Sequence, residues 1–368
     1  MVTGREVIDY SAAGVDTEKE ETALTGLHRW LDKTLHFRDG RIGVPVKGIG
    51  LFANILDIGN GLGLAISTDG VGTKILVARM MEKYDTVGID CIAMNVNDIL
   101  CVGAEPIALV DYLAVAEANP ELIEQISKGL HDGAEIAEIS IPGGEIAQIP
   151  EMLADGLPGI AFDIAGTAVG HVQLDKIISG HEIGHHDIIV GLRSSGIHSN
   201  GLTLAREVLF KRRGLNVDTF LSELGRTVGE ELLEPTTIYV RPINEMIKNP
   251  EIHVKALIHI TTDGLFNLTR VESKVGFVID YLPEPQPVFS IIQSFGNITD
   301  EEMFRVYNMG IGFCVIVPEQ DVDKVKEIAK KHDIQSYIIG HAVDEPEQKV
   351  FIKSKSLIGK GRKSFKIQ

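Results

Sequence analysis

The sequence predicts a mixed α/β protein with two domains, and three observations support this. Its 368 residues exceed the length that one hydrophobic core usually organises. Apolar runs of strand length alternate with segments of helical periodicity. A polar stretch with glycines, residues 173–186, separates the two halves. We therefore expect an N-terminal domain at 1–172, a C-terminal domain at 173–350 and a basic tail at 351–368.

The first half alternates strands and helices. Asn119 is a suitable N-cap for a helix over 120–138, because Pro120 fits the first helical position and apolar residues then recur every fourth residue from Leu122. Further helices are expected at 74–83 and 88–100, and strands at 62–67, 107–115, 138–141 and 159–172.

The second half begins with a strand at 187–193, which is followed by a loop and a helix from Leu202. Thr299-Asp300-Glu301-Glu302 is a capping box that opens another helix, and 321–332 is a charged amphipathic helix. Further strands are expected at 254–261, 275–281, 310–317 and 336–343.

Composition restricts the class of function. The formal net charge of −17 disfavours non-specific binding to nucleic acid or to membranes. No uncharged run is long enough to span a bilayer, and the N-terminus lacks the pattern of a secretion signal. The three cysteines form no C-x-x-C pair, which is typical of buried thiols in a reducing cytosol, so a cytoplasmic protein is expected. The basic residues after Phe351 predict a solvated, poorly ordered tail.

The stretch Ser67-Thr68-Asp69-Gly70-Val71-Gly72-Thr73-Lys74 lies between a predicted strand and a predicted helix. Backbone N–H groups at such a junction suit anionic oxygens, and here an acid and a lysine lie beside them. The spacing is not that of a Walker loop. By itself the stretch is equally compatible with a tight turn.

A second polar cluster lies inside the predicted helix 88–100. Asn95, Asn97 and Asp98 fall within one turn of it, and their neighbours are apolar. Asn and Asp are mediocre helix formers, so this turn either faces solvent or lines a polar cleft.

A third cluster, Gly143-Gly144-Glu145, follows the predicted strand 138–141. Its glycines allow a ligand to approach the backbone closely, and Glu145 adds an oxygen ligand. Together with Asp69 and Asp98, Glu145 would form an all-oxygen site of the kind that Mg²⁺ uses with nucleotide phosphates.

Histidines occur in two different contexts. His198 lies in the loop 194–201, directly after a strand, where loops tend to line clefts, although a turn role fits equally well. No G-x-S-x-G elbow accompanies it, so a Ser–His nucleophile is not expected. His181, His185 and His186 lack the spacing of a structural zinc site, and an exposed turn is predicted there.

With these segments in order, the chain resembles the phosphoribosylformylglycinamidine cyclo-ligases, or AIR synthetases, of purine biosynthesis. The resemblance extends from Asp9 to about Val350. Each segment is weak singly, but their order and separations are specific. The strongest are Thr68–Lys74, Asp85–Asp98, Gly103–Pro106, Gly143–Glu145 and Ser194–Gly201.

The resemblance implies an ATP-dependent ring closure. ATP would phosphorylate the formyl amide oxygen of formylglycinamidine ribonucleotide, and an amidine nitrogen would then displace phosphate to give 5-aminoimidazole ribonucleotide. ATP and Mg²⁺ are the implied cofactors, with Asp98 and His198 as catalytic residues and His198 as a proton-transfer group. The implied metal ligands are Asp69, Asp98 and Glu145. The implied nucleotide contacts are Gly70, Gly72, Thr73, Lys74, Asn97, Gly143 and Gly144. The implied substrate contacts are Ser195, His198, Ser199, Asn200 and Gly201.

The resemblance also implies the architecture. Both domains would have the AIR synthetase-like fold, and the N-terminal domains of a homodimer would pair through their sheets into a β-barrel. Residues 9–16 would close over the active site as a lid. The implied partners are the ribonucleotide substrate and ATP, without nucleic acid or membrane.

Three departures from the family pattern leave alternatives open, one of them an early loop at 48–53 with fewer glycines than the family usually has. Thr262 and Asp263 replace two glycines of the family's His-x-x-Gly-Gly-Gly-Phe motif, and Ile146 and Glu151 replace a threonine and a glycine. A selenophosphate synthetase-like protein would carry a reactive cysteine in residues 47–54, which have none. A thiamine-monophosphate kinase-like protein would lack the 194–201 pattern. A non-catalytic nucleotide-binding scaffold subunit is the third alternative, and the three acids argue against it.

Overall fold

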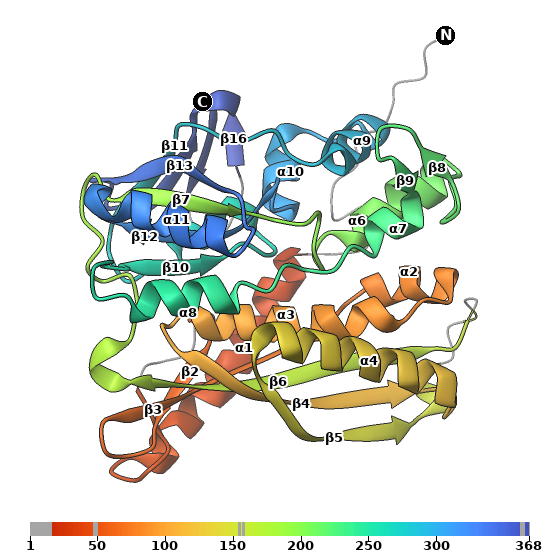
Figure 1. The fold of residues 1–368 in the computed structure, drawn as a ribbon, viewed down its shortest axis with the longest axis horizontal. Helices are drawn as coiled ribbons and strands as arrows, with labels where there is room; N and C mark the ends of the chain where they lie inside the picture. The colour runs from red at the N-terminus through yellow and green to blue at the C-terminus, as the bar shows by residue number, and fades with distance from the viewer. Residues whose placement is uncertain (1–16, 47–50, 154–155, 157–158, 361–364, 368) are drawn as a thin grey trace.

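The computed structural model describes residues 17–46, 51–153, 156, 159–360 and 365–367. Its strands form two large sheets with helices between and around them (Figure 1). The lid expected at residues 9–16 lies outside the described residues. Within the described part of the chain, no helix is both long and apolar enough to cross a membrane.

The first sheet has six strands in the order β1-β2-β3-β6-β4-β5. Neighbours are antiparallel except β4 and β5, which are parallel because α4 (Pro120–Ala137) connects them as a crossover. Helices α3 (Asp85–Leu100) and α4 cover one face of this sheet. The strands are β1 (Val44–Pro45), β2 (Asn54–Asp57), β3 (Leu62–Gly70), β4 (Glu105–Val115), β5 (Ser140–Gln148) and β6 (Phe162–Gln173).

Glycines let α3 and α4 cross with their backbones in contact. A Cβ on Gly88 would lie 2.3 Å from the backbone nitrogen of Leu130, and one on Gly129 would lie 2.1 Å from the carbonyl oxygen of Asp85. Neither position has room for a methyl group. The close contact with α4 therefore fixes the position of α3, and with it the position of its polar face, between the sheets.

The second sheet has eight strands in the order β10-β12-β7-β13-β11-β14-β15-β16, antiparallel except for the pair β11 and β14. Strand β12 is buried along its whole length. The strands are β7 (Ile188–Arg193), β10 (Ala256–His259), β11 (Gly276–Ile279), β12 (Ile311–Val317), β13 (Ser336–Val343), β14 (Lys349–Ile352), β15 (Leu357–Lys360) and β16 (Phe365–Ile367).

Shorter elements complete the fold. In Figure 1, α8 (Val240–Lys248) and α3 lie between the two sheets, and they are in contact. The other α-helices are α1 (Thr17–Leu31), α2 (Lys74–Met81), α5 (Pro150–Leu153), α6 (Leu202–Arg206), α7 (Val228–Leu232), α9 (Pro287–Gly296), α10 (Asp300–Val306) and α11 (Val322–Lys331). The 3₁₀ and π segments are η1 (Asp32–Arg38), η2 (Leu174–Lys176), η3 (Glu207–Arg212), η4 (Gly264–Thr269), η5 (Glu319–Asp321) and η6 (Lys353–Lys355), and a small hairpin pairs β8 (Phe220–Leu221) with β9 (Arg226–Thr227).

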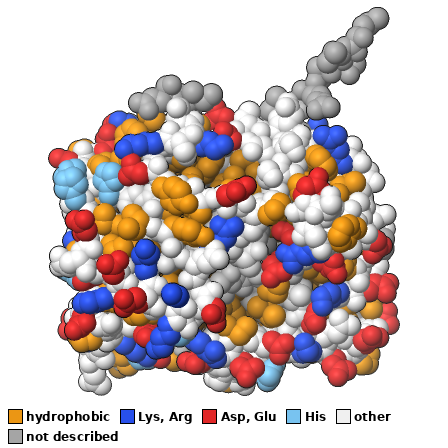
Figure 2. All heavy atoms as spheres, turned by 45° about the horizontal axis from the view of Figure 1, so that its top comes forward, with side chains coloured by type: hydrophobic (Ala, Val, Ile, Leu, Met, Phe, Trp, Pro, Cys, Tyr) orange, Lys and Arg blue, Asp and Glu red, His pale blue; other side chains and the backbone are white. Residues whose placement is uncertain are grey.

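The expectation of a poorly ordered basic tail is wrong. Residues 357–360 and 365–367 continue the second sheet as β15 and β16, and Leu357 and Phe365 are buried in the core. Phe365 is buried and stacks on Phe266 with ring centroids 3.9 Å apart. Two of the lysines form surface ion pairs, Lys353 with Asp280 and Lys355 with Asp300. On the face shown in Figure 2, acidic and basic side chains are interspersed.

Candidate active site at the domain interface

The polar turn of α3 faces the second domain and not solvent. Asn97 is fully buried; its side chain donates to the carbonyl of Thr237 at 2.9 Å and accepts from the backbone N–H of Tyr239 at 3.0 Å. Asn95 is also buried and donates to the carbonyl of Asp69 at 3.1 Å. The turn is therefore not a solvated face, because both amides are buried and hydrogen-bonded to other parts of the chain.

Asp69 and Asp98 lie near enough to each other at this interface for their charges to interact. Asp69 lies near the end of β3, where the N–H of Gly70 donates to its carboxylate at 2.7 Å. Burial and the nearby charge of Asp98 raise the pKa of Asp69 to about 6, although Gly70 and His259 act in the opposite direction. Two carboxylates held close in a low-dielectric site repel each other, and a cation bound between them would relieve that repulsion.

His259, at the end of β10, reaches Asp98 from the second domain. Its Nδ1 lies 2.8 Å from a carboxylate oxygen of Asp98; the imidazole is fully buried and the Asp98 side chain is 18% exposed. An ionised carboxylate only accepts, so Nδ1 carries the proton. Nε2 of His259 has no hydrogen-bond partner within the described ranges. His259 was not among the predicted site residues. The sequence signal that could have identified it is its place in the His-x-x-Gly-Gly-Gly-Phe motif.

The buried imidazole of His198 stabilises the 194–201 loop by accepting backbone hydrogen bonds. Its Nε2 accepts from the backbone N–H groups of Ser195 at 3.3 Å and Thr237 at 3.4 Å. Burial, together with the charges of His259 and Lys74, places the pKa of His198 well below its usual range. The residue is only 1% exposed, so the expectation that it transfers protons to substrate does not fit this geometry.

The expected substrate contacts of the 194–201 loop differ in how far they reach the surface. Ser195, Ser199 and Asn200 are half-buried. Asn200 accepts from the hydroxyl of Thr262 at 2.9 Å, so one of the departures from the family pattern adds a contact to this loop. Gly201 is buried with φ of 76°, and a Cβ there would lie 2.3 Å from the ring of Tyr307. Its role is therefore to allow close packing.

Lys74 does not lie where a phosphate ligand is expected. It is completely buried, and its ammonium forms an ion pair with Asp90 at 2.8 Å and donates to the carbonyl of Glu234 at 2.5 Å. The N–H of Gly70 is likewise engaged, by Asp69. The other expected nucleotide contacts of this stretch lie nearer the interface surface: Gly72 has φ of 68° and open space beside it, and the Thr73 hydroxyl lies 3.0 Å from that of Thr203 in the second domain.

Glu145 does not join the two aspartates, and the expectation of three converging acids is wrong for this chain. Strands β6 and β4 separate β3 from β5, which is about 14 Å at the usual strand spacing. Register places Glu145 opposite Tyr112, one residue beyond Asp111, which shares a row with Asp69 across Gly166. Successive residues point to opposite faces of a sheet, so Glu145 and Asp69 point to opposite faces. Among the residues that the structure describes, no three His, Cys, Asp or Glu side chains are grouped to hold a metal.

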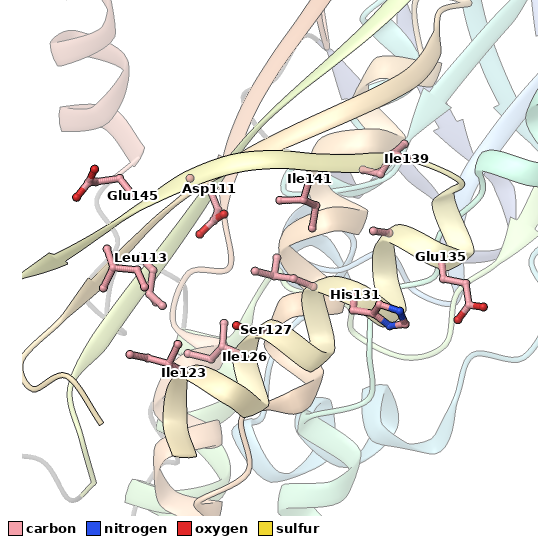
Figure 3. Close-up of a pocket in the computed structure, with 14 residues that line it drawn as sticks. Asp111, Leu113, Ile123, Ile126, Ser127, His131, Glu135, Ile139, Ile141 and Glu145 are labelled. Carbon is pink, nitrogen blue, oxygen red and sulfur yellow. The ribbon is translucent and has the colours of Figure 1, made fainter. Parts of the chain in front are cut away.

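Gly144 and Glu145 line a separate pocket of about 660 Å³ between β4, β5 and α4, and Gly143 precedes them on β5. Isoleucines and leucines make up half of its lining residues, and Gly144 packs directly on the Asp111 carboxylate. Figure 3 shows the Asp111 carboxylate pointing into this pocket and the Glu145 side chain pointing away from Asp111.

Comparison with known proteins identifies relatives of the whole chain. Residues 52–172 match the N-terminal domain of the AIR synthase related protein family, and residues 184–353 match its C-terminal domain. A phosphoribosylformylglycinamidine cyclo-ligase of Methanocaldococcus jannaschii is 48% identical over 96% of both chains. One from Pyrococcus horikoshii is 47% identical over 93% of this chain and 97% of its own. Among solved structures, a thiamine-monophosphate kinase from Stenotrophomonas maltophilia has a TM-score of 0.59 at 20% identity, covering 88% of this chain and 95% of that one, which shows a shared fold.

Proposed function

The chain belongs to the phosphoribosylformylglycinamidine cyclo-ligase family, and from this premise we propose that the family's reaction takes place between its two domains, at Asp69, Asp98 and His259. The reaction is the ATP-dependent closure of formylglycinamidine ribonucleotide to 5-aminoimidazole ribonucleotide, with ADP and phosphate as the other products. The observation that carries the location is the 2.8 Å contact between Asp98 of one domain and His259 of the other.

The acids at this interface suit a divalent cation that accompanies ATP. Asp69 and Asp98 supply hard oxygen ligands, and their mutual repulsion favours a bound cation. Bound Mg²⁺ would neutralise phosphate charge as it is transferred. His259 engages one oxygen of Asp98 and leaves the other to face a ligand, so we assign His259 the role of orienting Asp98. Gly72 and Thr73 lie at the same end of β3 and are the proposed phosphate contacts.

The loop 194–201 is the proposed substrate side of the site. Ser195, Ser199 and Asn200 are half-buried, so each can present a polar atom to a ligand. The segment that follows His259 contacts this loop, since the hydroxyl of Thr262 donates to Asn200, and His259 in turn contacts Asp98. A substrate held there would meet ATP across the interface, which is the proximity that a phosphoryl transfer requires.

A homodimer is the proposed assembly, with the first sheets of two copies facing each other. Among the described elements, α3 and α4 cover one face of this sheet. On its opposite face, Val110 and Tyr112 of β4 are 44% and 47% exposed, and Ile66 and Val169 are half-buried beside them. An apolar sheet face of this kind is typically covered by another layer. We also propose domain limits of 1–172 and 173–350, followed by the strands of the C-terminal segment.

The test is a product assay. Purified protein is mixed with formylglycinamidine ribonucleotide, ATP and Mg²⁺, and we expect aminoimidazole ribonucleotide and ADP in equal amounts. Thiamine monophosphate replaces the substrate in a parallel reaction, in which we expect no phosphorylation. ADP formation only with thiamine monophosphate would indicate the kinase of the same fold, and ATP binding without any ADP would indicate a non-catalytic subunit. Either result would refute the proposal.

A further inference from the structure

Residues 234–239, here called the interdomain segment, connect α7 to α8 without regular secondary structure. A segment without helix or strand must satisfy its backbone polar groups in other ways when it is buried. Ile238 and Tyr239 of this segment are buried, as is the side chain of Thr236. Its partners come from both domains, and they determine what it can do.

Toward the first domain, the interdomain segment is bound by buried charged and amide groups. Asp90 accepts from both the backbone N–H and the hydroxyl of Thr236, each at 2.7 Å. Lys74, paired with Asp90, donates to the carbonyl of Glu234 at 2.5 Å. Asn97 bridges the carbonyl of Thr237 and the N–H of Tyr239. The segment is thus fixed on α3.

Toward the second domain, the same segment binds the 194–201 loop. The hydroxyl of Ser195 donates to the carbonyl of Pro235 at 2.5 Å. The hydroxyl of Ser199 lies 3.0 Å from that of Thr236. The geometry of the loop is therefore set through the interdomain segment by α3, the helix that carries Asp98.

The hydroxyl protons in this network have only one consistent arrangement. Asp90, ion-paired with Lys74, is an acceptor, so the Thr236 hydroxyl donates its single hydrogen bond to Asp90. Ser199 must then donate to Thr236, since a hydroxyl pair shares one proton. The hydroxyl of Ser195 likewise donates its single hydrogen bond to the carbonyl of Pro235. Both serine oxygens keep free lone pairs and have no proton left to give.

We propose that the interdomain segment orients Ser195 and Ser199 as hydrogen-bond acceptors for N–H or O–H groups of the substrate, with Thr236 as the positioning residue. This inference rests on the proposed function. A phosphate group offers only acceptor oxygens when ionised, so these serines do not bind it. The amidine, amide and ribose hydroxyl groups of formylglycinamidine ribonucleotide are donors that match them.

The test compares Thr236→Val, Ser199→Ala and the double variant by steady-state kinetics. Each single variant should raise KM for the ribonucleotide by about 3- to 10-fold, the value of one neutral hydrogen bond, and leave KM for ATP unchanged. The double variant should resemble Ser199→Ala alone, because Thr236 acts through Ser199. Thr236→Ser keeps the hydroxyl and should restore KM. Thr227→Val is the control: it removes the capping box of α7 and lowers stability outside this network.

A second measurement covers the case in which Thr236→Val does not fold. Inorganic phosphate is used as a competitor of the ribonucleotide at saturating ATP, and its inhibition constant should be the same in Ser199→Ala and in the wild type. Weaker inhibition in Ser199→Ala, a lower KM in Thr236→Val, or multiplicative effects in the double variant would each overturn the inference. An inactive wild type would instead refute the proposed function.

Discussion

Replacing Lys74 by methionine distinguishes a structural role of this lysine, as the partner of Asp90, from a role in binding phosphate. Both partners of its ion pair with Asp90 are completely buried, with nitrogen–oxygen distances of 2.8 and 2.9 Å. Removing one partner of such a pair leaves a buried charge without compensation, which typically costs about 3–5 kcal/mol. Thr236 would still donate two hydrogen bonds to Asp90, so we expect the lower part of that range. Urea unfolding measures the loss as a lower midpoint.

A second substitution tests whether the uncompensated charge is the cause. Lys74→Met with Asp90→Asn removes the charge and keeps an acceptor for Thr236, so the double variant should be more stable than Lys74→Met alone. Calorimetry of ATP binding to folded Lys74→Met should give nearly the wild-type affinity. A large loss of ATP affinity with an unchanged unfolding midpoint would show that Lys74 faces phosphate and would refute this reasoning.

Three further predictions concern packing and pH. Gly88→Ala should destabilise the protein by about 1–3 kcal/mol, since the methyl would meet the backbone at Leu130, and chemical denaturation should show it. Phe365→Ala should cost about 3–5 kcal/mol by the same measurement if its stacking on Phe266 seals the core; a solvated tail would give no change. Folding lowers the pKa of His198, so below about pH 6.5 the unfolded chain binds a proton at this residue and the folded chain does not. The free energy of unfolding should therefore fall as pH drops below about 6.5, and His198→Gln should reduce that fall.

The elements that the sequence predicts well are those with a strong local pattern. The helix from Pro120 forms as expected: Asn119 caps it by accepting from Leu122 at 2.9 Å, and its apolar stripe is buried. Strand β5 begins near the predicted short strand but continues to Gln148, because pairing with β4 outweighs the weak strand preference of its glycines. Helices α1 and α8 were not predicted. Strands β15 and β16 were missed because their lysines suggested a solvated tail.

The candidate site was predictable only in part. Asp69 and Asp98 lie in sequence patterns typical of ligand sites, and the structure places them near enough for their charges to interact. The partners of Lys74 could not be read from spacing, since Glu234 is 160 positions away and Asp90 lies in an apolar helix. Glu145 has a side chain of the type that binds metal ions, but the register of β5 on β4 points it to the face of the sheet opposite to that of Asp69. Long-range pairing of this kind depends on the fold and not on any local pattern.

The turnover of Asp98→Asn tests the location of the chemistry most directly. The amide keeps the shape of the side chain and can still accept from His259, but it removes the charge that we assign to Mg²⁺ and phosphate. Formation of aminoimidazole ribonucleotide at saturating substrates should fall on the order of 100-fold, with the unfolding midpoint close to that of the wild type. Turnover equal to the wild type would place the reaction away from this interface.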